Sequence, residues 1–204
     1  MERIVIVNYG MGNLRSVQKA LERCGVAAVI SDQPEDVANA DRLILPGVGA
    51  FRDAMDRLRS ANLVEPILEH IRIGKPFLGI CLGLQLLFTK SYEDGEHQGL
   101  NVLGGDVVRF EVPEGLKVPH MGWNAVRPTR PDPIWNGLPD PCFMYFVHSY
   151  YVRPADGSVI AAETDYPTPF PAAVRSNNVF AVQFHPEKSQ KHGLALLHNF
   201  ATSS

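Results

Sequence analysis

The segment PFLGICLGLQLLF, residues 76–88, has two parts for which we predict different secondary structure. Its first part, 76–81, is a short apolar run of the kind that forms a strand buried on both faces of a parallel sheet. We expect the remainder, 82–88, to continue as a helix. In open α/β sheets ligands bind outside the carboxyl ends of the strands, and Cys81 falls at such an end. The segment therefore predicts an α/β fold with a cysteine at the edge where ligands bind.

Strand and helix signals alternate on the amino-terminal side of this segment. Short apolar runs at 3–7, 26–30 and 42–45 predict strands. The stretch NLRSVQKALERCG (13–25) predicts a helix that Asn13 caps and Gly25 ends. This alternation implies a parallel sheet with right-handed crossovers.

From about residue 100 strand-like pieces follow one another, with turns between them. They are NVLGGDVVRF (101–110), CFMYFVHSYYV (142–152), SVIAAE (158–163) and VFAVQF (179–184), and a closing helix spans 193–200. The Pro-rich stretch 128–141 predicts a surface loop. We therefore predict one domain over residues 1–204. Its fold is α/β, with an open, mainly parallel sheet flanked by helices and an added antiparallel or mixed strand section in the carboxyl-terminal half.

Composition narrows the class of protein. The chain has 204 residues, is 45% hydrophobic and carries a formal net charge of −3, which gives no electrostatic case for binding nucleic acid or an anionic membrane. No leader-like or membrane-length apolar segment stands out, so we expect a cytoplasmic protein. The spacing of Cys24, Cys81 and Cys142 favours neither a disulfide framework nor a metal site. We expect no cofactor and no metal.

Cys81 stands in a G-x-C-x-G arrangement, Gly79 to Gly83. Small neighbours permit the sharp strand-to-helix turn of a nucleophile elbow, which lifts the side chain clear of the sheet. The helix N-terminus that follows favours the thiolate and offers the N–H of Leu82 to an oxyanion. A free cysteine is also commonly a small buried apolar residue. We prefer that interpretation for Cys24 and Cys142, whereas for Cys81 alone both remain open.

A candidate base lies in VQFHPEKS, residues 182–189. Pro186 favours an extended His185, and residues two apart in an extended chain point to one side, so His185 and Glu187 should project together. A carboxylate beside an imidazole holds its tautomer and stabilises the imidazolium. The alternatives are a solvent-exposed pair or a zinc site, and zinc fits less well because no second ligand stands at metal spacing. With Cys81, the three side chains form a coherent set for acyl transfer.

In these motifs the chain resembles the class I (triad) glutamine amidotransferases, which have a flavodoxin-like fold, and the resemblance runs over essentially its whole length. The segments that carry it are NYGMGNLRSV (8–17), LPGVGAF (45–51), GICLGLQLL (79–87), PHMGWN (119–124), YFVHSYY (145–151) and HPEKS (185–189). PGVG and PHMGWN resemble the branch of the family that serves histidine biosynthesis. Asn8 departs from the Asp often found in the family's opening motif, a position without a catalytic role.

The resemblance implies how the chemistry is divided. Cys81 is the implied nucleophile, His185 the general base and later acid, and Glu187 the carboxylate that orients it. The N–H of Leu82 and the Val48–Gly49 backbone would bind the oxyanion, and glycines flanking Val48 would permit a peptide flip that switches this site. From composition alone PGVG also fits an ordinary strand-to-helix turn.

The same resemblance implies a substrate and its contacts. L-Glutamine would be held by Gly49, Gln85, Ser149 and Tyr150, and would be hydrolysed to glutamate and ammonia. Taken by itself, Gln85 also fits a solvated helix residue one turn beyond Cys81.

Ammonia is protonated and lost in water, so the family delivers it to a partner through a channel. The implied partner is a (β/α)₈-barrel cyclase subunit in a heterodimer. We expect its interface at 10–15, which includes Asn13 and Arg15, at 119–124, which includes Trp123 as a loop residue, and at Lys188.

Three rival interpretations remain at the level of sequence. Gly10-Met11-Gly12 could open a dinucleotide fingerprint, but Arg15 stands where that motif needs its last glycine. A catalytically dead binding module would have no reason to retain all three residues of the acyl-transfer set. A sibling amidotransferase or a free-standing γ-glutamyl hydrolase would keep them but would not depend on the barrel partner.

Overall fold

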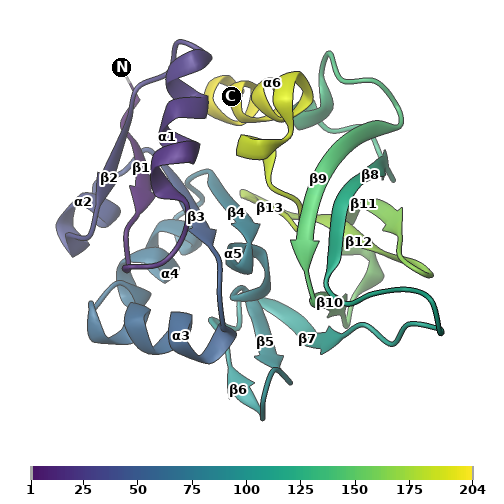
Figure 1. Cartoon of the computed structure of the whole chain (residues 1–204). Coiled ribbons are helices and arrows are strands. Elements are labelled where there is room, and N and C mark those ends of the chain that lie inside the picture. Colours follow the sequence, from purple (N-terminus) through teal and green to yellow (C-terminus); the bar gives the residue numbers. More distant parts are fainter. Residues whose placement is uncertain (1, 204) are drawn as a thin grey trace.

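The computed structural model describes residues 2–203 and is an α/β structure with two sheets (Figure 1). The strands are β1 (Ile4–Val7), β2 (Ala28–Ser31), β3 (Arg42–Gly47), β4 (Phe77–Cys81), β5 (Phe88–Ser91), β6 (His97–Gln98), β7 (Leu103–Arg109), β8 (His120–Pro128), β9 (Cys142–His148), β10 (Tyr150–Pro154), β11 (Ile160–Asp165), β12 (Pro169–Ser176) and β13 (Val179–Val182). The helices are α1 (Leu14–Arg23), α2 (Pro34–Ala38), α3 (Phe51–Ser60), α4 (Val64–Arg72), α5 (Leu82–Gln85) and α6 (Gln190–Thr202), with 3₁₀ turns η1 (Pro133–Trp135), η2 (Gly157–Val159) and η3 (Pro186–Lys188).

The larger sheet has the strand order β2-β1-β3-β4-β13-β12-β11-β8-β9. Its first five strands are parallel, and the remaining four continue the same sheet in antiparallel pairing. A second sheet of order β10-β7-β5-β6 lies beside it (Figure 1). The predicted fold class is confirmed, with the added antiparallel section forming an extension of the main sheet. Within residues 2–203, no helix has the length and apolar character needed to cross a membrane.

Alternation along β1 explains why helices cover both faces of the parallel strands. Ile4 and Ile6 pack into the cluster that contains the buried side chains of α1 and α6. Val5 and Val7 pack into the opposite cluster, with those of α2, α3 and α4. Because successive side chains of a strand point to opposite faces, a wholly apolar strand needs cover on both.

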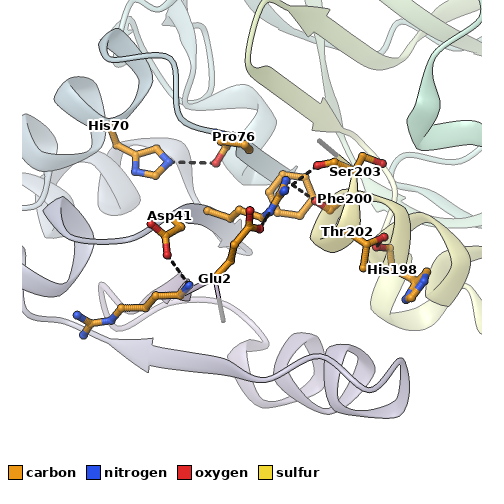
Figure 2. Close-up of polar contacts among 10 residues, drawn as sticks. Glu2, Asp41, His70, Pro76, His198, Phe200, Thr202 and Ser203 are labelled. Carbon is orange, nitrogen blue, oxygen red and sulfur yellow. Dashed lines mark hydrogen bonds and ion pairs between the residues drawn. The ribbon is translucent and has the colours of Figure 1, made fainter.

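Arg42 ties the amino end of β3 to the end of α6, at Phe200 and Ser203, which are labelled in Figure 2. Its guanidinium donates hydrogen bonds to the carbonyl oxygens of Phe200, at 3.0 Å, and Ser203, at 2.6 Å, and forms an ion pair with Glu2. The final carbonyls of a helix have no partner within the helix, and a cation there also complements the helix dipole. This clamp holds the closing helix at the end of the sheet opposite to the carboxyl edge.

Several predicted elements differ in the structure. The helix expected over 82–88 ends at Gln85, and Phe88 begins β5. The run 142–152 is two strands in different sheets, broken at Ser149. Local pattern could not show either change, because both depend on which strand lies alongside. The sequence analysis does not predict strands β6, β8 and β12. Asn13 occupies the cap position of α1 as predicted, but its side chain makes no cap hydrogen bond. The Pro-rich loop contains η1, whose Ile134 and Trp135 are buried.

Gly193 allows α6 to pack directly on η3. A β-carbon at this position would lie 1.9 Å from the carbonyl oxygen of Pro186, a backbone atom that cannot move aside. Gly193→Ala should therefore lower the free energy of unfolding by about 2–3 kcal/mol, although Gly→Ala inside a helix ordinarily stabilises. Urea unfolding measures this. Gly157→Ala is the control, because a β-carbon there meets nothing within 4 Å. Equal stability of the two variants would contradict the packing argument.

Candidate active site

The site lies where three neighbouring parallel strands end. Gly47, at the end of β3, pairs with Cys81, at the end of β4. On the other side of β4, Val182 of β13 pairs with Ile80, so Gln183 and His185 follow immediately beyond this row. The carboxyl ends of adjacent parallel strands meet at one edge, which is where open α/β sheets bind ligands.

Cys81 occupies a strained elbow. Its backbone has φ 55° and ψ −108°, in the region that side-chain-bearing residues rarely adopt. A β-carbon on Gly83 would lie 1.8 Å from the carbonyl oxygen of Leu45, and one on Gly79 would lie 2.8 Å from the carbonyl oxygen of Gly83. Helix α5 therefore crosses β3 at a distance that only glycine allows. This explains the G-x-C-x-G pattern and places the N–H of Leu82 at the start of α5, next to the thiol.

His185 and Glu187 form a buried pair. Nδ1 of His185 lies 2.8 Å from Oε1 of Glu187, and both side chains are 2% exposed. The pairing is as predicted, but the geometry is different, because Glu187 lies in the 3₁₀ turn η3 and only His185 is extended. The backbone of His185 is held by its N–H to the carbonyl oxygen of Tyr145 and by the hydroxyl of Ser189, which donates to its carbonyl oxygen.

The second ring nitrogen of His185, Nε2, is buried and has no hydrogen-bond partner among the described residues. Burial alone would lower the pKa of the imidazole, but the negative charges of the Cys81 thiolate and Glu187 outweigh it and raise the pKa of His185 to about 10. The two negative groups therefore favour the protonated form of the ring.

A cavity of about 390 Å³ opens onto Cys81 and His185. The predicted site residues that line it are Val48, Gly49, Cys81, Leu82, Gln85, Ser149, Tyr150 and His185. Glu187 lies behind His185 and does not reach the cavity. Segments from β3, β4, α5 and the β9–β10 junction are thus brought together around one space.

Gln85 is buried, so the interpretation as a solvated helix residue is wrong. Its Nε2 group donates to the carbonyl oxygen of Tyr150 at 2.9 Å and to Oε1 of Gln183 at 3.1 Å. With both N–H groups occupied, Oε1 is the atom of this side chain that remains to accept a hydrogen bond from a ligand.

The structure adds Glu93 to the cavity wall. Its Oε2 accepts the N–H of Phe51, at 2.7 Å, which begins α3 directly after the PGVG segment. Burial raises the pKa of this carboxyl, and the nearby acidic residues Asp94 and Asp53 add to the effect, while the Phe51 N–H opposes it. In the sequence Glu93 stands within SYEDGE, a polar run typical of a solvated turn, so no local signal identifies it.

The PGVG segment, residues 46–49, contacts Tyr9 and Met11 in the loop between β1 and α1. The hydroxyl of Tyr9 donates to the carbonyl oxygen of Pro46 at 3.0 Å, and a β-carbon on Gly47 would lie 2.6 Å from that hydroxyl. Gly49 has φ +94°, and a β-carbon there would lie 2.7 Å from Cε of Met11. The backbone that leads to Val48 and Gly49 is therefore positioned by contacts with residues about 40 positions earlier.

The residues expected at a partner interface lie at the surface. Asn13 and Arg15 are exposed at the start of α1. Trp123 is 47% exposed but belongs to strand β8, so its expected placement in a loop is wrong. Its ring meets that of Tyr145 edge to face, and Nζ of Lys188 lies 5.9 Å from the centre of the same tyrosine ring.

A chain of neutral side chains borders the cavity at His148. Its Nδ1 lies 2.8 Å from the carbonyl oxygen of Tyr150, which can only accept, so this nitrogen carries the proton. Nε2 of His148 then accepts from Nδ1 of His120 at 3.1 Å, and Nε2 of His120 accepts from Nδ2 of Asn124 at 3.2 Å. Burial lowers the pKa of His120 to about 4 and that of His148 to about 3.

A thiol at a strand-to-helix elbow, an imidazole held by a buried carboxylate and a cavity open to both are the geometry of a cysteine-dependent acyl-transfer enzyme. The chain belongs to the class I glutamine amidotransferase family, whose model matches residues 5–203.

Named relatives and solved structures resemble the chain over nearly its whole length. The chain is 61% identical to imidazole glycerol phosphate synthase subunit HisH of Syntrophotalea carbinolica, over 97% of this chain and 98% of the relative. It is 58% identical to the protein of the same name from Rhodopirellula baltica, over 98% and 97% of the two chains. The fold is similar to a glutamine amidotransferase crystal structure with a TM-score of 0.75 and 22% identity, over 96% of this chain and 98% of that one. It also resembles PurLQS from Thermotoga maritima, with a TM-score of 0.74, 20% identity and 98% of both chains covered.

The two neutral histidines should make the protein sensitive to acid. Below pH 6.5 the unfolded chain binds protons at His120 and His148 that the folded chain does not bind until pH about 4 and about 3. The free energy of unfolding should therefore fall as the pH drops from 6.5, by up to about 1.4 kcal/mol per pH unit for each histidine. Urea unfolding between pH 5 and 7.5 measures the slope, and His148→Gln should reduce it. An unchanged slope in the variant would count against a neutral His148.

Proposed function

We propose that this chain is the glutaminase subunit of an imidazole glycerol phosphate synthase, which releases ammonia from L-glutamine for a partner subunit in histidine biosynthesis. The observation that carries the proposal is the cavity in which the Cys81 elbow faces an imidazole held by Glu187. The names of full-length relatives at 61% and 58% identity supply the pathway.

In the proposed first half-reaction, Nε2 of His185 takes the proton of the Cys81 thiol, and the resulting thiolate attacks the side-chain carboxamide carbon of glutamine. A C–S bond forms, and the negative charge moves to the carbonyl oxygen. The N–H of Leu82 and the backbone at Val48–Gly49 are the candidate donors to that oxygen, and losing one such donor typically costs ~10²–10³ in rate. The protonated His185 then gives its Nε2 proton to the departing amide nitrogen as the C–N bond breaks, so ammonia leaves and a γ-glutamyl thioester remains.

In the second half-reaction, His185 acts as a base. Its neutral Nε2 takes a proton from water, and the resulting hydroxide attacks the thioester carbon. The C–S bond breaks, the thiolate is restored, and glutamate leaves. Glu187 orients the ring throughout, because its Oε1 lies 2.8 Å from Nδ1.

Two acceptors in the cavity fit the α-ammonium group of glutamine. The carboxylate of Glu93 supplies a negative charge at the wall. The Nε2 group of Gln85 is already bonded to Tyr150 and Gln183, which leaves its Oε1 as the acceptor for a ligand. Ser149 and Tyr150 line the same space and complete the proposed binding site with Gly49.

A partner is needed because free ammonia becomes ammonium in water and is no longer a nucleophile. The relatives' names describe subunits, which supports assembly with a second chain. We propose a (β/α)₈-barrel cyclase that docks on the exposed residues Asn13, Arg15, Trp123 and Lys188. This places the partner close to η3, whose Glu187 belongs to the catalytic pair.

Glutamate release from glutamine tests the proposal directly. We expect low activity from this chain alone and strong stimulation when a barrel cyclase subunit and its ribonucleotide ligand are added. Cys81→Ala should abolish activity in both conditions, because no other group supplies the nucleophile. High activity that ignores the partner would keep the acyl-transfer chemistry but favour a free-standing γ-glutamyl hydrolase, and no activity in any condition would favour a binding module.

Charge reversal at the surface tests the proposed interface. Lys188→Glu should weaken partner binding about tenfold or more, because the proposal places this charge at the interface and reversing it would oppose docking. Arg52→Glu makes the same charge change on α3 and should leave affinity unchanged. Isothermal titration with the barrel subunit measures both. Lys188→Glu with wild-type affinity and wild-type stimulation would contradict this placement of the partner.

A further inference from the structure

Gln183 is a buried polar residue directly behind the candidate nucleophile. It follows β13, whose Val182 pairs with Ile80 of β4, and this register places it beside Cys81. Its side chain is fully buried, with an exposed fraction of 0%. A buried carboxamide costs free energy unless its N–H and C=O groups find partners, so the contacts of this group have to be accounted for.

The carboxamide of Gln183 links the nucleophile to the cavity wall. Its Nε2 donates to Sγ of Cys81 at 3.7 Å, and its Oε1 accepts from Nε2 of Gln85 at 3.1 Å. Gln85 in turn donates to the carbonyl oxygen of Tyr150 at 2.9 Å. A continuous line of hydrogen bonds therefore runs from the thiol to a backbone group that lines the cavity.

We propose that Gln183 is a further catalytic residue, whose amide N–H stabilises the Cys81 thiolate and whose bond to Gln85 sets the position of the sulfur relative to bound glutamine. The second part of this proposal rests on the proposed glutaminase function. The first part concerns the free enzyme and stands without it.

The choice of a carboxamide suits both steps of the chemistry. An amide N–H donates to a thiolate without giving up its proton, so it stabilises the charge and leaves the sulfur nucleophilic. A hydrogen bond to a charged acceptor is stronger than one to a neutral acceptor. The bond therefore strengthens when the thiol ionises and weakens when the thioester forms, which favours return to the thiolate during hydrolysis.

In this proposal His185 and Gln183 have different functions at the Cys81 sulfur. The imidazole carries the transferable proton, because its Nε2 has no other partner among the described residues and its Nδ1 is fixed by Glu187. The amide supplies a second donor that cannot transfer its proton. Loss of Gln183 should leave proton transfer intact and reduce the population of thiolate.

The pH dependence of alkylation separates this role from simple packing. Gln183→Met has similar volume and no donor. In the free enzyme it should move the midpoint of the pH profile of iodoacetamide inactivation upward by about one unit, which is about a tenfold fall in rate at pH values well below the midpoint. Gln183→Glu replaces the donor by a negative charge and should move it further. In the glutaminase assay both variants should lose about 10- to 100-fold in kcat/KM, with most of the loss in kcat.

Gln98→Met is the matched control, because Gln98 is exposed on β6, outside the cavity wall, and should behave as wild type. In the wild-type protein, the side-chain amide proton resonances of Gln183 should shift with the same pH midpoint as the thiolate absorbance near 240 nm. This measurement decides the matter even if the variants do not fold. An unshifted alkylation midpoint in Gln183→Met, or amide resonances that ignore thiol ionisation, would overturn the proposal. Shifted midpoints in an enzyme that lacks glutaminase activity would retain the hydrogen bond and reject the proposed function.

Discussion

The parallel pairing of β4 between β3 and β13 is the constraint on which the rest of the structure depends. It aligns Gly47 with Cys81 on one side and brings Gln183 level with Cys81 on the other. Backbone hydrogen bonds set this alignment, so a slip of one residue would turn the thiol toward the opposite face. The main sheet therefore positions the nucleophile and the start of the PGVG segment. Beyond the strand ends, Tyr9 and Met11 contact the PGVG segment, and Tyr145 and Ser189 hold the backbone of His185.

The close approach of α5 to β3 follows from this pairing. The elbow at Cys81 adopts a left-handed backbone conformation and turns the chain back over Leu45, where a side chain at residue 83 has no room. Such strain persists only when the surroundings determine it fully. Here the two neighbouring strands and the packing of α5 fix the strained backbone at Cys81. The thiol is therefore held at the start of α5, on the same cavity as the imidazole of His185.

The binding wall depends on the junction of the two sheets. Strand β9 belongs to the large sheet and β10 to the small one, and the chain changes sheets at Ser149. Ser149 and Tyr150 therefore line the cavity from one side, while Glu93, from the turn after β5, lines it from the small sheet. The carboxyl-terminal half thus supplies the base and one side of the wall, and the amino-terminal half supplies the nucleophile and the other side.

By itself the sequence predicted the α/β class, the elbow at Cys81 and the pairing of His185 with Glu187, because the motif that indicates each lies within a few positions. Tertiary structure alone decided that Gln85 is buried, that Glu93 reaches the cavity, and that Gln183 touches the nucleophile. Strand register and the change of sheet at Ser149 bring these residues to partners that lie 42 to 102 positions away along the chain, and no local pattern encodes that. Gln183 did carry one signal, because it is the polar residue in the otherwise apolar run 179–184, but its partner is defined only by the pairing of β13 with β4.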